Sequence, residues 1–269
     1  MSTTHRAIGT AKTIKLGECK SAEIIIIGDT HIGSPFTMSS YFFAIKKWLA
    51  EKPNRYAIHT GDLYEAATIG SKGDPYHCLP LDQAEEEAVG WLKSLGDKLI
   101  CMVDGNHDQR YARMIGKDVV ADAACKAGVS YFGDEAYLNV KLGHWDNQSK
   151  ASRSPVCYCV YVTHGVGGGR TAGSQINSLL RLREIVEADI YIQGHQHDPI
   201  CKHKSIYQFH GGSIVEKQQV FVVGGSALGR KGYPTQKAYA PTSHDFPVIT
   251  LSGSRKVMST TVIPLTYAL

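Results

Sequence analysis

The sequence predicts an α/β protein in which two β-sheets pack face to face and helices lie outside them. Strand-like and helix-like segments alternate through the first half of the chain, and strand-like segments dominate the second half. No internal repeat and no low-complexity linker separates the halves. The 269 residues allow one large domain or two small ones, and this order of elements favours a single domain over residues 1–269.

Three apolar strands organise the first half. They follow a short strand-like segment at residues 8–16 and begin at Glu23, Arg55 and Leu99. From Glu23 to Gly33 the chain reads EIIIIGDTHIG, in which four consecutive β-branched isoleucines run directly into a glycine. Such a run favours a buried strand.

Helices are expected between and after these strands. Residues 38–51 have helical apolar spacing and stop before a proline. Asp82 begins a second helix, with Glu85 three residues on in the pattern of a capping box. A third helix covers residues 117–126 and ends at Gly128. The first half therefore reads β-α-β-α-β-α.

The second half contains one further helix among its strands. Ser174 is expected to cap this helix, which runs through Glu187, and a strand follows from Asp189. The other strand-like runs cover residues 136–142, 156–163, 213–216, 219–223, 247–251 and 257–263. Residues 229–245 read as a long polar loop.

The composition is that of an ordinary globular protein, with 43% hydrophobic and 20% charged residues. The net charge of +4 permits a polyanionic partner without requiring one. Seven cysteines, an odd number without a paired framework, argue against a secreted disulfide scaffold and favour the cytoplasm. The N-terminus lacks the apolar core of a signal peptide, and no stretch is suited to span a bilayer.

Metal-ligand residue types follow the ends of five strand-like runs, each at a glycine. They are Asp29 and His31; Asp62; Asn106, His107 and Asp108; His164; and His195 and His197. In α/β proteins, functional groups collect outside the carboxyl ends of the strands. Carboxylate, amide and imidazole groups gathered at one such edge predict a metal centre.

The motifs D-x-H, G-D, G-N-H-D, a lone H-G and G-H-x-H occur in this order. Together they resemble the motifs of the calcineurin-like metallophosphoesterases, over roughly residues 23–225. Within that family they are similar to those of the DNA-repair exonuclease and phosphodiesterase branch. The resemblance implies a four-layer α/β/β/α sandwich of two mixed β-sheets, with two metal ions at the strand ends.

The resemblance also implies which residues hold each ion. One ion would be held by Asp29, His31 and His197, and the other by Asn106, His164 and His195. Asp62 would bridge both ions, because a carboxylate has two oxygens. Imidazole ligands suit transition metals. We therefore expect two divalent ions, with Mn²⁺ as the first choice and Fe, Zn or Ni as alternatives.

The reaction implied is hydrolysis of a phosphoester by a hydroxide held between two ions roughly 3.5–4 Å apart. His107 resembles the family histidine that gives a proton to the leaving oxygen, a role typically worth ~10²–10⁴-fold in rate. Glu65 stands where the family's G-D-x-x-D motif has its second acid, commonly Asp. It is expected to orient His107 and to raise the pKa of that imidazole.

Two polar residues near these motifs have plainer interpretations. His59 lies inside the strand that begins at Arg55, and we expect a packed histidine there rather than a ligand. Asp108 either neighbours the ligands or caps the segment that follows it.

The substrate class is less directly encoded. The serine/threonine phosphatase branch has an arginine in a D-R-G motif where this chain has Glu65, Ala66 and Ala67, so that branch is disfavoured. Basic and aromatic residues lie near the motifs in sequence: Arg110, Tyr111, Arg113, Lys117, Arg230, Lys231 and Tyr233. They suit a rim that binds a strand of nucleic acid, with scattered solvated charges as the alternative. Arg110, Arg113, Arg230 and Lys231 are the expected substrate contacts.

Other functions stay open. A small-molecule phosphodiesterase, for example on cyclic nucleotides, or a phosphomonoesterase would need a closed pocket. A non-catalytic binding module would be expected to lose ligands, yet all eight metal and acid positions are present. We therefore expect a nuclease-type phosphodiesterase with nucleic acid as its substrate and no membrane partner, and a homodimer stays open.

Overall fold

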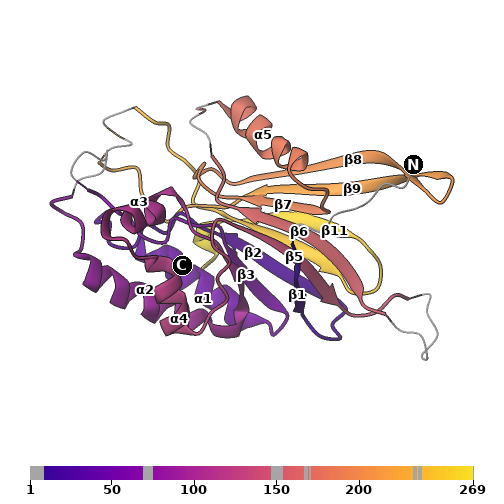
Figure 1. The fold of residues 1–269 in the computed structure, drawn as a ribbon, viewed down its shortest axis with the longest axis horizontal. Coiled ribbons are helices and arrows are strands. Elements are labelled where there is room, and N and C mark those ends of the chain that lie inside the picture. Colours follow the sequence, from indigo (N-terminus) through magenta and orange to yellow (C-terminus); the bar gives the residue numbers. More distant parts are fainter. Residues whose placement is uncertain are drawn as a thin grey trace.

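Two mixed β-sheets lie face to face, and helices lie on both outer sides of the pair (Figure 1). The structure is a computed structural model that describes residues 9–68, 75–146, 154–166, 169, 171–232, 235 and 238–268. It confirms the predicted α/β fold with two mixed sheets.

The five-stranded sheet has the order β11-β10-β2-β3-β4. Its strands are β2 (Ser21–Ile27), β3 (Arg55–His59), β4 (Leu99–Met102), β10 (Phe246–Ser252) and β11 (Met258–Ile263). The strands β2, β3 and β4 run parallel, whereas β10 is antiparallel to both β2 and β11. The three parallel strands therefore end at the same edge of the sheet.

The six-stranded sheet has the order β1-β5-β6-β7-β9-β8. Its strands are β1 (Lys12–Lys15), β5 (Glu135–Leu142), β6 (Val156–Thr163), β7 (Ile190–Gln193), β8 (Ile200–His210) and β9 (Ser213–Val223). The strands β6, β7 and β9 run parallel, and β8 pairs antiparallel with β9 at one edge of the sheet.

The helices form the two outer layers. They are α1 (Ser39–Glu51), α2 (Leu81–Leu95), α3 (Asn106–Ile115), α4 (Val119–Ala127) and α5 (Ala172–Arg181), with short 3₁₀ turns at Gly96–Lys98, Leu182–Glu184 and Leu265–Ala268. Residues of α1, α2 and α4 share an apolar core with the five-stranded sheet, and α5 packs on the six-stranded sheet. Among the helices described, none combines the length and apolar character that crossing a bilayer requires.

The four isoleucines of β2 contribute to two hydrophobic cores, one on each face of the strand. Ile24 and Ile26 face the core between the sheets, while Ile25 and Ile27 face the core under the helices. Successive side chains of a strand point to opposite faces. Since both faces of β2 are covered, all four isoleucines are buried, as predicted.

Two elements were not predicted. Helix α3 is polar, with Asp108 as its one buried residue, so it lacks the apolar spacing that marks a helix. Strand β8 is largely exposed and carries a mixture of lysine, histidine and aromatic residues. Strand β9 joins two runs that were predicted separately, because its partner β8 pairs with it along the whole length.

Two predicted helix caps were wrong. Helix α2 begins at Leu81 after Pro80 and has no side-chain cap, so Asp82 lies in its first turn instead of capping it. Helix α5 is capped by Thr171, whose side chain accepts the backbone N–H of Ser174, and its α-helical part ends at Arg181. The predicted end of α4 at Gly128 is confirmed, where φ is 72°.

Candidate metal centre

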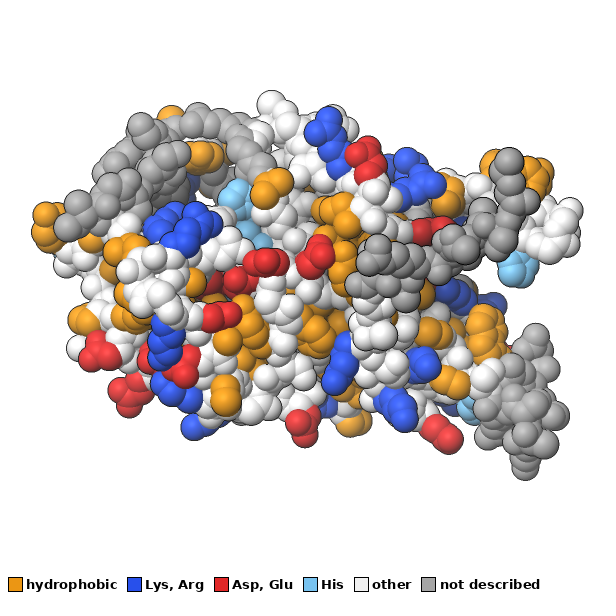
Figure 2. Space-filling model, viewed as in Figure 1, with side chains coloured by type: hydrophobic (Ala, Val, Ile, Leu, Met, Phe, Trp, Pro, Cys, Tyr) orange, Lys and Arg blue, Asp and Glu red, His pale blue; other side chains and the backbone are white. Residues whose placement is uncertain are grey.

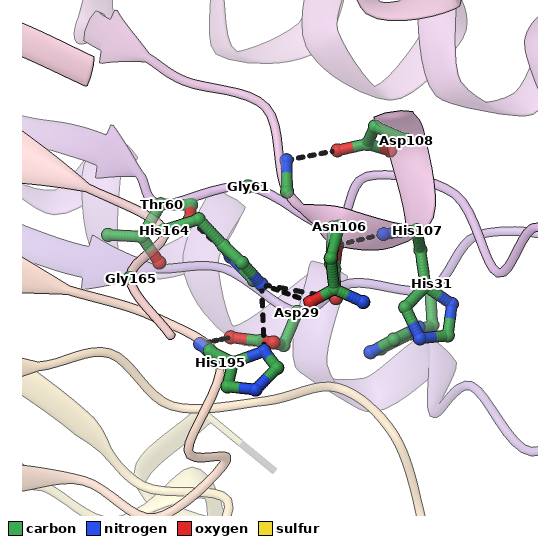
Figure 3. Close-up of polar contacts among 12 residues, drawn as sticks. Asp29, His31, Thr60, Gly61, Asn106, His107, Asp108, His164, Gly165 and His195 are labelled. Carbon is green, nitrogen blue, oxygen red and sulfur yellow. Dashed lines mark hydrogen bonds and ion pairs between the residues drawn. The ribbon is translucent and has the colours of Figure 1, made fainter. Parts of the chain in front are cut away.

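The carboxyl ends of β2, β3, β4, β6 and β7 bring the predicted ligands together. The segments that follow these strands carry, in order, Asp29 and His31; Asp62; Asn106 and His107; His164; and His195 and His197. Figure 3 shows the side chains of Asn106, His164 and His195 pointing toward one another. Among the described residues, His and Asp side chains form three groups in each of which the ligand atoms lie within 4.8 Å of one another, and all three groups belong to this set.

The first cluster contains Asp29, His31 and His197. The Nε2 atoms of His31 and His197 face each other at 3.4 Å, and Asp29 Oδ1 lies 3.1 Å from His197 Nε2. Asp29 and His31 are buried. The cluster matches the residues that the family resemblance implies for one ion.

The second cluster contains Asp62, His164 and His195. His164 Nε2 is its centre, at 3.3 Å from Asp62 Oδ2 and 3.2 Å from His195 Nδ1. Asn106 Oδ1 lies 3.1 Å from the same nitrogen. Asp62 also belongs to a third group with His31 and His107, so its carboxylate lies between the two ligand sets.

These residues fit divalent metal ions. Nitrogen and oxygen lone pairs from separate loops converge on two adjoining positions, and such donors suit divalent transition ions. Burial alone would lower the pKa of His31, but its contacts with Glu65 and the charges of Asp62 and Asp29 raise it to about 9. Burial also acts to lower the pKa of His164, but the charge and contact of Asp62, helped by Asp29, raise it to about 10. The acidic residues thus attract positive charge to this site.

Outer hydrogen bonds set which imidazole nitrogen faces the clusters. His164 Nδ1 lies 2.8 Å from the backbone oxygen of Thr60, which can only accept, so Nδ1 donates. His31 Nδ1 makes an ion-pair contact with Glu65 Oε2 at 3.1 Å, which also favours the proton on Nδ1. In a neutral imidazole this leaves Nε2 with its lone pair toward the cluster, which is the form that binds a metal.

The ligand loops have unusual backbone geometry. Among the described residues, seven other than glycine have positive φ, and five of these are predicted ligands: Asp29 (45°), His31 (46°), Asp62 (52°), His195 (67°) and His197 (58°). Such conformations cost of order 1–3 kcal/mol each and are retained where the surroundings enforce them. They turn the side chains of consecutive loop residues toward one centre.

Sequence reasoning missed Ser226, which holds the first ligand loop. Its hydroxyl donates to the backbone oxygen of Asp29 at 3.0 Å and accepts the N–H of Leu228 at 3.0 Å. The N–H of Ala227 donates to the same oxygen of Asp29 at 3.1 Å. Ser226 is fully buried. Its one sequence signal is its place in the glycine-rich segment GGSALG after β9.

His107 lies beside the clusters, but its relation to Glu65 differs from the expected one. His107 Nδ1 is 2.5 Å from the backbone oxygen of Glu65 and 3.7 Å from its carboxylate, which lies closer to His31. Burial and the neighbouring His31 lower the pKa of His107 to about 4, although Asp62 and Glu65 act to raise it. Glu65 therefore orients both imidazoles, its carboxylate at His31 and its backbone oxygen at His107, and the expected rise in the pKa of His107 is wrong.

His59 is a packed residue, as expected. It is buried against Trp91, with its Nδ1 accepting the N–H of Gly61 at 3.2 Å and its Nε2 3.2 Å from the Thr30 hydroxyl. Burial lowers its pKa to about 4, so it is neutral at physiological pH. His59 supports the loop that carries Asp62.

Asp108 turns away from the clusters and joins two ligand loops. Its carboxylate accepts the backbone N–H groups of Leu63, Tyr64 and Gly105 at 3.1, 3.0 and 2.9 Å. It thereby caps α3 and fixes the loop after β3 against the loop after β4. Of its two interpretations, the capping one is correct.

The predicted substrate contacts lie in two places. Arg110 donates to the backbone oxygen of Ala66 at 2.9 Å, directly after Glu65, and Arg113 is exposed one turn further along α3. Arg230 is exposed and donates to the backbone oxygen of Tyr239 at 2.8 Å, with Lys231 next to it. Figure 2 shows basic side chains beside the histidines, over the region of α3. Tyr233 lies outside the described residues.

A glycine next to the ligands gives a direct test of the geometry. A Cβ atom at Gly105 would lie 2.1 Å from Asp62 Oδ1 and 2.4 Å from the Asp62 backbone nitrogen. We expect Gly105→Ala to displace Asp62, to reduce bound metal by more than half, and to destabilise the fold by about 1–3 kcal/mol. Metal analysis and thermal unfolding measure both effects.

The control for this substitution is Gly90→Ala. Gly90 lies in α2 with no atom within 4 Å of an added Cβ, so this variant should keep its metal and gain slightly in helix stability. A Gly105→Ala protein with full metal content would mean that Asp62 does not need its present position.

The chain belongs to the calcineurin-like phosphoesterase family, because the profile of that family matches residues 22–199. Similar solved structures include the calcineurin-like phosphoesterase YfkN from Bacillus subtilis, with 13% identity over 91% of each chain and a TM-score of 0.46. The phosphoesterase Yfce from E. coli has 12% identity over 90% of this chain and 99% of its own, with a TM-score of 0.41.

A third similar structure is GAP50, the anchor in the inner membrane complex of Plasmodium, with 10% identity over 93% of this chain and 87% of its own, and a TM-score of 0.48. No curated protein matches the chain. At these identities the likeness concerns the fold alone. The family suggests a phosphoesterase, and its motif residues form the clusters described above.

Proposed function

We propose that this protein hydrolyses phosphodiester bonds in nucleic acid. The observation that carries the proposal is the shared carboxylate of Asp62, which lies between two adjoining His/Asp clusters with His107 beside it. When bound, two divalent ions would supply Lewis acidity toward a phosphate and would lower the pKa of a water molecule. We expect Mn²⁺ to serve best, with Fe, Zn or Ni as alternatives.

The chain's own residues would divide the remaining work. Asp29, His31 and His197 would hold one ion and Asn106, His164 and His195 the other, with Asp62 between them. His107 is the proton donor to the leaving oxygen. Its Nδ1 donates to the backbone oxygen of Glu65, so the proton for the leaving oxygen would come from Nε2 of the charged imidazolium form.

Basic residues beside the clusters support nucleic acid as the substrate. Arg110 and Arg113 lie on α3, the helix that begins with the ligand Asn106. Arg230 and Lys231 follow the segment whose Ser226 hydroxyl holds the loop of Asp29. A DNA or RNA strand presents a phosphate at every step, so cations on both segments would hold it across the centre.

A small-molecule phosphodiesterase or phosphomonoesterase is the second candidate. It is favoured by the depth of the clusters, in which Asp29, His31 and Asp62 are buried. Such an enzyme would cut cyclic nucleotides or small esters and would ignore DNA.

The test uses fluorescent single-stranded and duplex DNA with manganese at two salt concentrations. We expect both cleavage and binding to weaken steeply as salt rises. Combined Arg110→Gln and Lys231→Gln substitutions should lower the salt slope by about 0.7 per lost contact on a single strand. A small chromogenic diester, assayed in parallel, reports whether the metal clusters are intact in each variant.

The matched control is Lys12→Gln, which removes an exposed cation from β1 and should leave the salt slope unchanged. If neither DNA is cut while a cyclic nucleotide is, the second candidate replaces the nuclease. If no phosphoester is cut with any divalent metal, both enzyme proposals fail.

A further inference from the structure

Strands β8 and β9 form a long hairpin whose outer half extends past the rest of the sandwich (Figure 1). They pair along their whole length, and Gly211 and Gly212 close the turn with φ of 54° and 82°. Two residues with positive φ in a two-residue loop fit the twist of a hairpin. Strand β8 is the last strand of its sheet, so in the described part of the chain its outer edge has no neighbouring strand.

The outer half of this hairpin exposes large apolar side chains. Tyr207 is 82% exposed, Phe209 is 84% exposed and Ile214 is 66% exposed. Phe209 pairs with Ile214 in the register, and Tyr207 lies two residues before Phe209, so the three share one face. Hydrophobic side chains are visible at this end of the molecule in Figure 2.

This exposed face continues the inner face of the sandwich. Nearer the sheets, the same face carries Val220, which is buried in the core between them, and its register partner His203. His203 Nε2 lies 2.8 Å from the hydroxyl of Thr260 in β11, the edge strand of the other sheet. Beyond His203 the same face carries the exposed Tyr207, Phe209 and Ile214, together with Ser205, Glu216 and Gln218.

The charge of the hairpin tip indicates what would cover it. From Ser205 to Glu216 there is no lysine or arginine and one carboxylate. Lys217, just behind the tip, is engaged with Glu187 and Asp189. The tip therefore lacks the cations that bind nucleic acid and suits an apolar protein surface.

The tip also lies far from the metal centre. Strand β8 begins three residues after His197 and runs away from it for 11 residues. At about 3.3 Å per residue, the tip lies roughly 30 Å from the clusters. It is therefore not part of a substrate groove, and a binding role for the tip does not depend on the proposed function.

We propose that this tip binds a second copy of the chain, with β8 pairing antiparallel to β8 of the partner about a two-fold axis at Gln208. This register sets Tyr207 opposite Phe209 of the partner subunit, and the reverse contact follows by symmetry. Cross-strand aromatic pairs are among the favourable ones in sheets. Since the turn follows His210, this register pairs residues 206–210 of the two copies, so Lys202 and Lys204 lie outside the pairing and the lysines of the two copies do not face each other.

The area available predicts a weak dimer. Full burial of an aromatic side chain removes roughly 150–250 Å², and edge-to-edge pairing leaves one side of Tyr207 and Phe209 in solvent, so together they supply less than roughly 300–500 Å² per copy. A standard interface buries about 800 Å² per partner. Ile214 and the strand backbone add some buried area, but the total stays below that of a standard interface. The dimer should therefore depend on concentration.

Sedimentation velocity of the full chain from about 1 to about 200 μM tests the proposal, because association follows protomer concentration. Wild-type protein should shift from monomer to dimer across this range. Combined Tyr207→Thr and Phe209→Thr substitutions should keep it monomeric without changing its thermal stability, metal content or hydrolysis of a chromogenic diester. Phe43→Gln, which removes an apolar side chain 59% exposed on α1, is the matched control and should dimerise as wild type does.

A cross-link tests the register independently. Gln208→Cys should form a reducible dimer under mild oxidation, above the background of the seven free cysteines. Lys202→Cys, further from the axis, should not. A wild-type protein that stays monomeric, or a double variant that dimerises equally, overturns the proposal. Loss of single-stranded DNA binding in the double variant would also overturn it, because nucleic acid and not a second copy would then bind the hairpin tip.

Discussion

Replacing Asp62 by Asn is expected to remove bound metal and hydrolysis together. Asp62 Oδ2 lies 3.3 Å from His164 Nε2, and its Oδ1 accepts the N–H of His107 at 2.8 Å. An amide keeps one acceptor oxygen but loses the negative charge that both clusters share. We expect metal content to fall by at least one ion and activity by more than about 10²-fold, since even outer-shell changes cost 10–100-fold. Elemental analysis and a chromogenic diester assay measure both.

Asp189→Asn is the matched control for the loss of a buried carboxylate. Asp189 is equally buried but lies just before β7, where it contacts Lys256 at 2.7 Å and Lys217 at 3.5 Å. This control should lose stability and keep its metal. His164→Ala should behave as Asp62→Asn does. Full activity with normal metal content in Asp62→Asn or His164→Ala would show that these residues do not form a dimetal centre.

Replacing His107 by Ala is expected to leave the metal in place and to slow cleavage selectively. The effect should be ~10²–10⁴-fold on esters with poor leaving groups, which need a proton on the departing oxygen. Activated aryl esters leave as stable anions and should lose far less. The comparison is kcat/KM for a DNA or alkyl diester against an aryl diester, with bound metal measured for each preparation.

An equal loss on both esters would argue that His107 does not donate the proton. Its ring packs edge-on against His31 at 4.7 Å between centroids, so a loss of metal would instead indicate a supporting role in the first cluster. The metal measurement separates these two outcomes.

The meeting of the expected ligand residues at one edge could be predicted because it depends on local patterns. Each ligand loop follows an apolar run, and β2 is recognisable from four isoleucines that remain buried on both faces. Parallel strands then bring their carboxyl ends to one edge, so residues far apart in sequence meet without further information.

The parts that could not be predicted depend on contacts between distant segments. Helix α3 is stabilised at its start by Asp108 and the loop after β3, and it has no apolar stripe to reveal it. The carboxylate of Glu65 turns toward His31 because the left-handed loop brings them together, which a motif does not encode. Ser226 acts through a hydrogen bond to a residue 197 positions away.

Ser226 hydrogen-bonds to the loop of Asp29, and β10 pairs with the strand that precedes this loop. These contacts limit how far the chain can be shortened. A protein cut at residue 199, where the match to the family profile ends, would lose β10, which pairs with β2 from Ser21 to Ile25. Strand β2 would then become the rim of its sheet, with its backbone groups open to other chains and prone to aggregation. Any minimal domain built for study or engineering must therefore extend at least through Ser252, the end of β10.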